Sequence, residues 1–155
     1  MLNQSYSEQD YHWMHYAIQL AKKAESLNEV PVGAVLVLEN EVIGEGYNQP
    51  IFLNDPSAHA EMLALRGAAR NLENYRLPNA TLYVTLEPCM MCAGAMVHSR
   101  IQRLVFGASD PKTGTIMSVA NLLDAPFLNH KVQYQGGLCA PECGELLSNF
   151  FKSRR

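Results

Sequence analysis

Apolar residues near the start of the chain change from a helical to a strand-like period. Ser7 is followed by three polar residues and is typical of a helix N-cap, which accepts a backbone N–H of the first turn. Apolar positions then recur with the spacing of a helix that buries one face, at Met14, Ala17, Ile18, Ala21 and Ala24. The nearly all-apolar, β-branched run over 32–38 predicts a buried strand, and Glu39-Asn40 predicts a tight turn into a second strand over 42–47.

The rest of the chain alternates helical and strand-like segments. Residues 48–57 contain Asn, Pro, Asp and Ser and are expected to form a loop. Helices are predicted over 58–70, from 89 to about 98 and over 141–152, and strands over 81–86, 104–106 and 131–134. This order predicts a three-layer α/β/α arrangement with a mixed five-stranded sheet. We expect a single domain over residues 1–155.

The composition is typical of a folded domain. Hydrophobic residues make up 48% of the sequence and charged residues 17%, which supplies enough apolar side chains for a buried core. No apolar run approaches the length of about 18 residues that a membrane span needs. The polar start from Met1 to Asp10 differs from a secretion signal. We therefore expect no membrane association and a cytoplasmic location.

The net charge of −3 conceals an uneven distribution. Residues 1–99 carry five Lys and Arg against eleven Asp and Glu, whereas residues 100–155 carry seven against four. The basic residues of this second part are Arg100, Arg103, Lys112, Lys131, Lys152, Arg154 and Arg155. They are typical of a solvated basic face or of a rim that contacts phosphates, and the charges alone do not decide between the two.

Two predicted helix starts carry the residue types of a metal site. His59-Ala-Glu61 opens one helix, and Pro88-Cys89-Met-Met-Cys92 opens another. Two thiolates and one imidazole suit zinc. Cys89 and Cys92 are three residues apart, which places them on one face of a helix, and a helix N-terminus favours the thiolate form.

A set of three ligands indicates a catalytic metal site. A structural zinc ion normally has four protein ligands, whereas a catalytic one keeps a position for water, whose pKa it lowers towards neutral. Glu61 is the nearest carboxylate in the sequence and is a natural proton relay. Residues two apart diverge by about 200° in a regular helix, so His59 and Glu61 converge only if the helix is just beginning there.

Each of these residues also has an ordinary structural interpretation. A single His before a helix is usually a cap or a surface group, a first-turn Glu is usually solvated, and a single Cys-x-x-Cys is often a structural metal site or part of the core. Their coincidence at two helix starts favours the metal site. Cys139 and Cys143 have no further His or Cys pair near them, so we interpret them as helix-start and core cysteines.

At these residues the sequence resembles the cytidine deaminase superfamily, and within it most closely the tRNA-specific adenosine deaminases. The pattern H-x-E…P-C-x-x-C is the known signature of zinc-dependent nucleobase deaminases. The likeness covers nearly the whole chain, through the segments 29–35, 44–48, 55–61, 85–92 and 106–114. The last segment and the basic C-terminal residues point to the tRNA branch. The resemblance implies a cytidine-deaminase-like α/β/α fold.

The resemblance implies a reaction and a role for each residue of the signature. His59, Cys89 and Cys92 would bind one Zn²⁺ per subunit, and Glu61 would carry a proton from the water to ring N1 and then protonate the departing amine. Hydroxide attack at C6 of adenine would release ammonia and leave inosine, which is hydrolysis of a cyclic amidine C–N bond. Asn48 matches the family residue that hydrogen-bonds the flipped base, although an Asn after a strand is also a common turn residue.

The resemblance also implies an RNA substrate. The base must leave its stack to reach a buried metal, which is least costly in a single-stranded loop. The family's substrate is the wobble adenosine in the anticodon stem-loop of an arginine tRNA. Asp110 and Lys112 would contact flanking nucleotides, and the backbone of the RNA loop would be contacted by Phe151, Lys152, Arg154 and Arg155. A C-terminal aromatic is more often packed against its own core. The family forms homodimers in which both subunits contact the tRNA.

Two other functions are compatible with the same motifs. A guanine or free-nucleoside deaminase of the superfamily shares both of them, and the shape of the pocket and the basic C-terminal part would distinguish it. A catalytically inactive zinc- and RNA-binding partner subunit is the second alternative. Such a subunit would be expected to lack the proton relay, whereas Glu61 is present.

Overall fold

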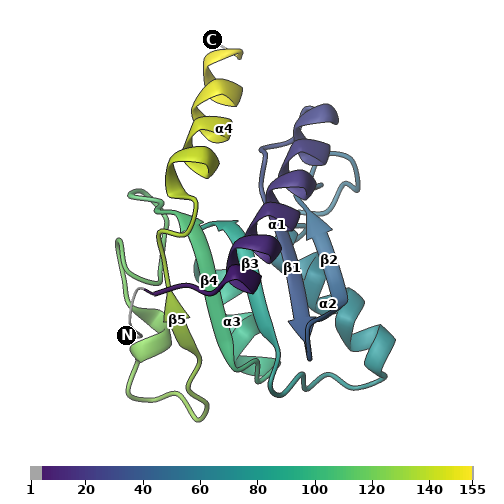
Figure 1. The fold of residues 1–155 in the computed structure, drawn as a ribbon, viewed down its shortest axis with the longest axis vertical. Helices are drawn as coiled ribbons and strands as arrows, with labels where there is room; N and C mark the ends of the chain where they lie inside the picture. The colour runs from purple at the N-terminus through teal and green to yellow at the C-terminus, as the bar shows by residue number, and fades with distance from the viewer. Residues whose placement is uncertain (1–4, 155) are drawn as a thin grey trace.

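A five-stranded mixed sheet lies between two pairs of helices in the computed structural model, which describes residues 5–154 (Figure 1). The sheet has the order β2-β1-β3-β4-β5. Its strands are β1 (Gly33–Leu38), β2 (Glu41–Tyr47), β3 (Thr81–Leu86), β4 (Arg103–Ala108) and β5 (Gln133–Gln135). Strand β1 is antiparallel to both of its neighbours, whereas β3, β4 and β5 are parallel. The predicted α/β fold with a mixed five-stranded sheet is confirmed.

Each face of the sheet is covered by two helices. They are α1 (Glu8–Ser26) and α4 (Ala140–Lys152) on one face, and α2 (Ala60–Leu72) and α3 (Met90–His98) on the other. A hydrophobic core lies on each face of the sheet, and successive residues of a strand point into opposite cores. In β4, Val105 packs on the α1 side, and Leu104 and Phe106 pack on the α2 side. A short 3₁₀ helix, η1 (Leu122–Asp124), lies between β4 and β5. Within residues 5–154, no helix has the length and apolar character to cross a bilayer.

The predicted helix N-cap at Ser7 and the predicted turn at Glu39-Asn40 are both present in the structure. The Ser7 hydroxyl accepts the backbone N–H of Asp10 at 3.1 Å, and the Asp10 carboxylate accepts that of Ser7 at 3.0 Å, which forms a capping box at the start of α1. Glu39 and Asn40 have φ angles of 51° and 59° and join β1 to β2. Two successive residues with positive φ form the type of two-residue turn that matches the twist of a hairpin.

The last two strands differ from their predicted bounds. Strand β4 covers 103–108 rather than 104–106, because its pairing with β3 continues to the Leu86–Ala108 pair despite the low strand preference of Gly107. Strand β5 covers 133–135 rather than 131–134, because its pairing with β4 begins only at Gln133, opposite Arg103.

Helix α2 packs directly on the backbone of β2 at Gly44. A Cβ atom at this position would lie 2.2 Å from the carbonyl oxygen of Ala64 and 2.7 Å from the backbone nitrogen of Ala68. No side chain fits there unless the backbone moves, so the close approach of helix and strand requires glycine. The contact fixes α2 relative to the sheet.

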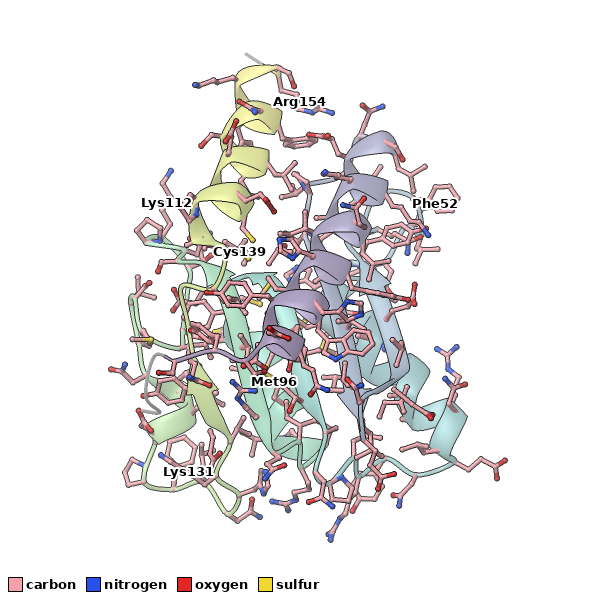
Figure 2. The ribbon with its side chains drawn as sticks, viewed as in Figure 1. Phe52, Met96, Lys112, Lys131, Cys139 and Arg154 are labelled. Carbon is pink, nitrogen blue, oxygen red and sulfur yellow. The ribbon has the colours of Figure 1, made fainter. Side chains whose placement is uncertain are left out.

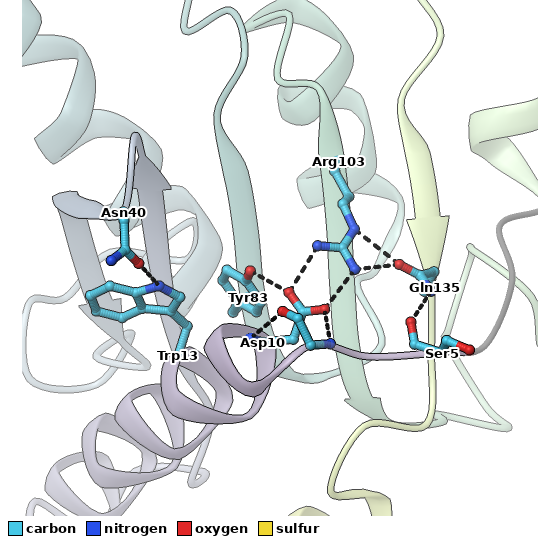
Figure 3. Close-up of polar contacts among 8 residues, drawn as sticks. Ser5, Asp10, Trp13, Asn40, Tyr83, Arg103 and Gln135 are labelled. Atoms are coloured by element: carbon cyan, nitrogen blue, oxygen red, sulfur yellow. Dashed lines mark hydrogen bonds and ion pairs between the residues drawn. The ribbon is translucent and has the colours of Figure 1, made fainter.

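The Asp10 carboxylate links helix α1 to strands β3 and β4 (Figure 3). It accepts hydrogen bonds from the Arg103 guanidinium at 2.9 and 3.1 Å and from the Tyr83 hydroxyl at 2.7 Å. Burial alone would raise the pKa of Asp10, but the hydrogen bonds from Arg103, the Ser7 N–H and Tyr83 outweigh burial and lower this pKa to about 2. Arg103 also donates from Nε to the side-chain oxygen of Gln135 at 2.9 Å, which extends the network to β5.

Asp10→Asn is expected to lower the free energy of unfolding by about 2–4 kcal/mol at pH 7, because it leaves the partly buried Arg103 without its charged partner. A carboxylate with a lowered native pKa stabilises the fold above its unfolded pKa. This stabilisation is lost as the pH falls from the unfolded value of 3.8 to about 2. Urea unfolding at pH 7 and pH 3 measures the effect. The deficit of the variant should be smaller at pH 3, and an equal deficit at both pH values would contradict the assignment.

Four segments of the chain meet at one end of the sheet, because β1 runs opposite to β2 and β3. Gly33 at the start of β1 pairs with Tyr47 at the end of β2, and Leu86 at the end of β3 pairs with Ala108 at the end of β4. The segments gathered at this end are 29–32, 48–59, 87–89 and 109–118. They contain His59, Cys89 and the proposed base-binding residue Asn48, and the third predicted ligand, Cys92, follows in the first turn of α3.

Candidate active site

His59, Cys89 and Cys92 come together at this end of the sheet. Nδ1 of His59 lies 3.6 Å from the sulfur of each cysteine, and the two sulfurs are 3.8 Å apart. It is the only cluster of at least three potential metal ligands found within residues 5–154. The three side chains could therefore hold one metal ion.

The N-cap conformation of both helices brings these side chains into position. His59 is the N-cap of α2, with φ −75° and ψ 153°, and Cys89 is the N-cap of α3, with φ −80° and ψ 176°. Neither side chain caps its own helix, so the imidazole and the sulfur remain available as ligands. The backbone of His59 is extended rather than helical, so the side chains of His59 and Glu61 are not turned away from each other as they would be within a regular helix. Both residues line the same cavity.

The two sulfurs lie within hydrogen-bonding distance of each other. The hydrogen bond between them, with a further contribution from His59, lowers the pKa of Cys89 to about 3. The same hydrogen bond, together with burial, raises the pKa of Cys92. The pair therefore holds a thiolate at neutral pH, which the N-terminus of α3 also favours. A bound cation would displace the remaining proton, because metal ligands are deprotonated thiolates.

A cavity of about 180 Å³ lies against the cluster. Its walls include the apolar residues Val30, Val32 and Leu86 and the polar residues Asn48, Glu61 and Glu87. Glu61 is only 4% exposed to solvent. Burial raises the pKa of Glu61 to about 7, so its carboxyl group can take up or release a proton near neutral pH.

The side chain of Asn48 has a fixed orientation in this cavity. Its Oδ1 accepts the backbone N–H of Ala60, the first residue of α2, at 2.8 Å. Because a backbone N–H can only donate, the oxygen must face Ala60, and the Asn48 amide nitrogen is left to donate elsewhere. Asn48 therefore holds the start of α2 and presents two N–H groups to whatever enters the cavity.

A larger cleft of about 480 Å³ opens beside the cavity. The two spaces share four lining residues: Val30, Leu86, Asp110 and Thr113. Lys112 and Phe151 also line the cleft. Phe151 is 52% exposed, whereas the adjacent Phe150 is 5% exposed and belongs to the core. The structure therefore assigns core packing to Phe150 and leaves Phe151 at the cleft.

The Asp110 carboxylate is used within its own loop. It accepts the backbone N–H groups of Lys112 and Thr113 at 3.0 and 3.1 Å and the Thr113 hydroxyl at 2.8 Å. These bonds form a tight turn that leaves the Lys112 side chain exposed to solvent. Figure 2 shows Lys112 pointing away from the body of the protein near the start of α4.

Lys152 and Arg154 lie at the far end of α4. Lys152 is exposed. The Arg154 guanidinium stacks on Phe150 at 3.6 Å from the ring centroid and donates to the side-chain oxygen of Asn28 at 2.9 Å. Arg154 thus joins the end of α4 to the turn after α1 (Figure 2). Arg155, which the resemblance also assigned to RNA contact, lies outside the described residues.

Sequence reasoning assigned no role to Glu87, which lines the cavity and is 2% exposed. Its carboxylate accepts four backbone N–H groups and one hydroxyl from the segment 110–118. Burial opposes ionisation, but the hydrogen bonds from Met117, Ser118 and Asp110 outweigh it and lower the pKa of Glu87. The sequence offers one signal, a charged residue directly between a buried strand and the Pro88-Cys89 helix start.

Comparisons with known proteins identify the family of the chain. A family model of the MafB19-like deaminases matches residues 8–155. A tRNA-specific adenosine deaminase of Haemophilus influenzae is 57% identical over 150 residues, which cover 96% of this chain and 87% of that protein. One of Bacillus subtilis is 48% identical over 147 residues, with coverage of 95% and 91%. A solved structure from work on A-to-I editing by tRNA:A34 deaminases at the wobble position of transfer RNA has a TM-score of 0.85 and 45% identity, and the match covers 88% of this chain and 99% of that one.

Proposed function

Because the chain belongs to the MafB19-like deaminases and, among them, to the tRNA-specific adenosine deaminases, we propose that it hydrolyses the wobble adenosine of a tRNA anticodon to inosine. One observation carries the proposal: three potential metal ligands converge beside the buried carboxyl group of Glu61, which lines the same cavity. The presence of this carboxyl group, Glu61, argues against a catalytically inactive partner subunit.

Zinc fits the three ligand atoms. Tetrahedral coordination with Zn–S distances of about 2.3 Å and Zn–N distances of about 2.0–2.1 Å requires sulfurs about 3.8 Å apart and S···N separations of about 3.6 Å. The corresponding distances in the cluster are 3.8 Å and 3.6 Å. When bound, zinc supplies hydroxide at neutral pH by lowering the pKa of water. We propose one zinc ion per subunit, held by His59, Cys89 and Cys92.

The protein's own groups position the base and move the protons. The Asn48 amide donates to an acceptor on the purine, since its oxygen is already bonded to Ala60. Glu61 accepts the proton of the attacking water and delivers it to ring N1, which makes C6 more electrophilic. After attack at C6, the Glu61 carboxylate takes the proton of the new C6 hydroxyl group and passes it to the departing amine, so that the C6–N bond breaks as the C6=O bond forms. Water and adenosine thus give ammonia and inosine.

The surface around the cavity suits a single-stranded loop. Lys112 and Phe151 line the cleft that adjoins the cavity, and the exposed Lys152 follows Phe151 at the end of α4. A cationic side chain near an exposed aromatic ring is typical of sites that contact phosphates and stack bases. We propose that these residues, with Asp110, Arg154 and Arg155, contact the nucleotides around the wobble position, and that the preferred substrate is an arginine tRNA.

A direct test uses an anticodon stem-loop that carries adenosine at the wobble position. Incubation with the purified protein is expected to give inosine, detected by mass spectrometry of the nucleosides, with about one zinc per chain by elemental analysis. The same stem-loop with the adenosine moved into the paired stem serves as the control and should remain unmodified. Rapid turnover of free guanine or free adenosine without inosine in the RNA would favour a free-base or nucleoside deaminase instead.

Asn48→Asp isolates the role of Asn48 in substrate binding. The variant keeps an oxygen for the Ala60 N–H but loses the amide donor, so the start of α2 should be preserved. We expect KM for the stem-loop to rise by about tenfold or more, the effect of losing one hydrogen bond to a buried base. Zinc content and Tm should remain near the wild-type values. An unchanged KM would remove Asn48 from base recognition.

We further propose a cytoplasmic homodimer. An apolar groove of about 320 Å³ on the α2–α3 face is available to a second copy, and Tyr75 at this groove is 65% exposed. The groove is lined by Met62, Leu65, Arg66, Ala69, Tyr75, Ala95, His98 and Ser99. Sedimentation velocity measures the oligomeric state.

A further inference from the structure

The Glu87 carboxylate is the centre of a hydrogen-bonded loop. Oε1 accepts the backbone N–H of Asp110 at 3.1 Å and the Ser118 hydroxyl. Oε2 accepts the backbone N–H groups of Ile116, Met117 and Ser118 at 3.0, 2.8 and 3.0 Å. One side chain at the end of β3 therefore satisfies backbone donors at both ends of the segment 110–118, which we call the cleft loop.

The cleft loop is packed against Glu87 as well as bonded to it. A Cβ atom at Gly114 would lie 2.4 Å from Cδ of Glu87, 2.5 Å from its Oε1 and 2.6 Å from the carbonyl oxygen of Asp110. The Thr115 N–H and hydroxyl both donate to the carbonyl oxygen of Pro88, at 3.0 and 3.1 Å. The middle of the loop is thus held against the same short segment that leads into the cysteine ligands.

The charge of Glu87 is balanced by the cleft loop itself. Among the described residues, no Lys, Arg or His side chain forms an ion pair with Glu87. Its negative charge is stabilised by N–H dipoles and one hydroxyl, and these donors can reach the carboxylate together only when the loop is folded as seen. The carboxylate therefore determines the loop conformation.

The cleft loop forms the wall between the two spaces of the site. Asp110 and Thr113 line both the cavity and the cleft, and Lys112 lines the cleft. The groups that carry out the chemistry lie on other elements, at the starts of α2 and α3. Displacement of the cleft loop should therefore weaken binding of the RNA more than it slows deamination of the bound base.

We propose that Glu87 is a positioning residue for substrate recognition: it folds the cleft loop into the wall that receives the nucleotides next to the adenosine. This inference rests on the proposed tRNA substrate. Glu87 does not itself contact the reacting atoms, and it acts through the backbone of residues 110–118.

Glu87→Gln tests the inference with little change in size. The amide nitrogen of glutamine cannot accept, so the N–H groups on one side of the side chain lose their acceptor. We expect KM for the anticodon stem-loop to rise by about tenfold or more, while kcat falls by less than about threefold and zinc content is unchanged. Amide hydrogen exchange at Ile116, Met117 and Ser118 should also become faster, and this readout does not depend on activity.

Two further variants separate positioning from general stability. Asp10→Asn lowers stability on the opposite face of the sheet and should leave KM near the wild-type value. Gly114→Ala displaces the cleft loop without touching the charge of Glu87, and should reproduce the rise in KM. Because both changes act on the same loop, the double variant should raise KM by less than the product of the two single effects.

The outcomes are distinguishable. If the wild-type protein forms no inosine in the stem-loop, the proposed function fails, while the exchange data still report whether Glu87 holds the loop. If the wild type is active but Glu87→Gln and Gly114→Ala leave KM unchanged, or change it no more than Asp10→Asn does, the inference is wrong. Should Glu87→Gln fail to fold, Gly114→Ala alone decides it.

Discussion

Glu61→Gln is expected to lower kcat for the stem-loop by about 10²–10⁴-fold, the usual contribution of a positioned general acid–base group. Glutamine has nearly the same shape but cannot carry a proton between the water, ring N1 and the departing amine. Zinc content and stem-loop binding should be retained. Because burial raises the pKa of Glu61 to about 7, the ionised form opposes folding, and the neutral side chain should not lower Tm.

The matched control for this substitution lies on the same helix. Glu73 is the exposed C-cap of α2, at the other end from His59 and Glu61. Glu73→Gln makes the same chemical change away from the cavity and should leave kcat unaltered. Single-turnover formation of inosine measures both variants. Residual turnover by Glu61→Gln within about tenfold of wild type would assign the proton transfers to another group.

Removal of the metal should have an effect of similar size. Dialysis against a chelator is expected to abolish inosine formation and to lower Tm by about 10 °C. This shift corresponds to about 4 kcal/mol of binding free energy for a metal present at roughly a thousand times its Kd. Added Zn²⁺ should restore both properties. Mg²⁺ should not, because it prefers oxygen ligands.

Cysteine substitutions locate this effect at the proposed site. Cys92→Ser should reduce zinc content and inosine formation together, because a serine hydroxyl replaces a thiolate ligand. Cys139→Ser is the control, since Cys139 precedes α4 and lies outside the ligand cluster. Full activity of zinc-depleted protein, or equal zinc loss in both variants, would contradict the ligand assignment.

The features predicted from sequence depend on spacing and local conformation. The ligand cluster could be predicted from the sequence because His59, Cys89 and Cys92 combine residue types suited to zinc with positions at helix starts. The capping box of Ser7 and the turn at Glu39-Asn40 are likewise determined by residues close together in the chain. Such signals are present in the sequence itself, because the partners are only a few residues apart.

The features that were missed depend on partners far apart in the chain. Glu87 bonds to residues more than 20 positions away, and the buried Gln135 owes its place to Arg103, 32 positions earlier. The stacking of Arg154 on Phe150 is local, but its bond to Asn28 spans 126 positions. The pattern of hydrophobic and polar residues does not show which distant residues will be hydrogen-bonded to each other. A buried carboxylate or amide therefore has the same pattern as an ordinary surface residue.

The contact at Gly44 has a consequence for which adenosines the protein can accept. Helix α2 rests on strand β2 with backbone against backbone, so the end that carries His59 and Glu61 cannot move aside for a bulky or paired substrate. All the distortion must then occur in the RNA. An adenosine in a duplex would lose its pairing and stacking, at a cost of a few kcal/mol, whereas one at the turn of a hairpin loses much less. Stiffness of the polypeptide would thus discriminate among the many adenosines of a single tRNA.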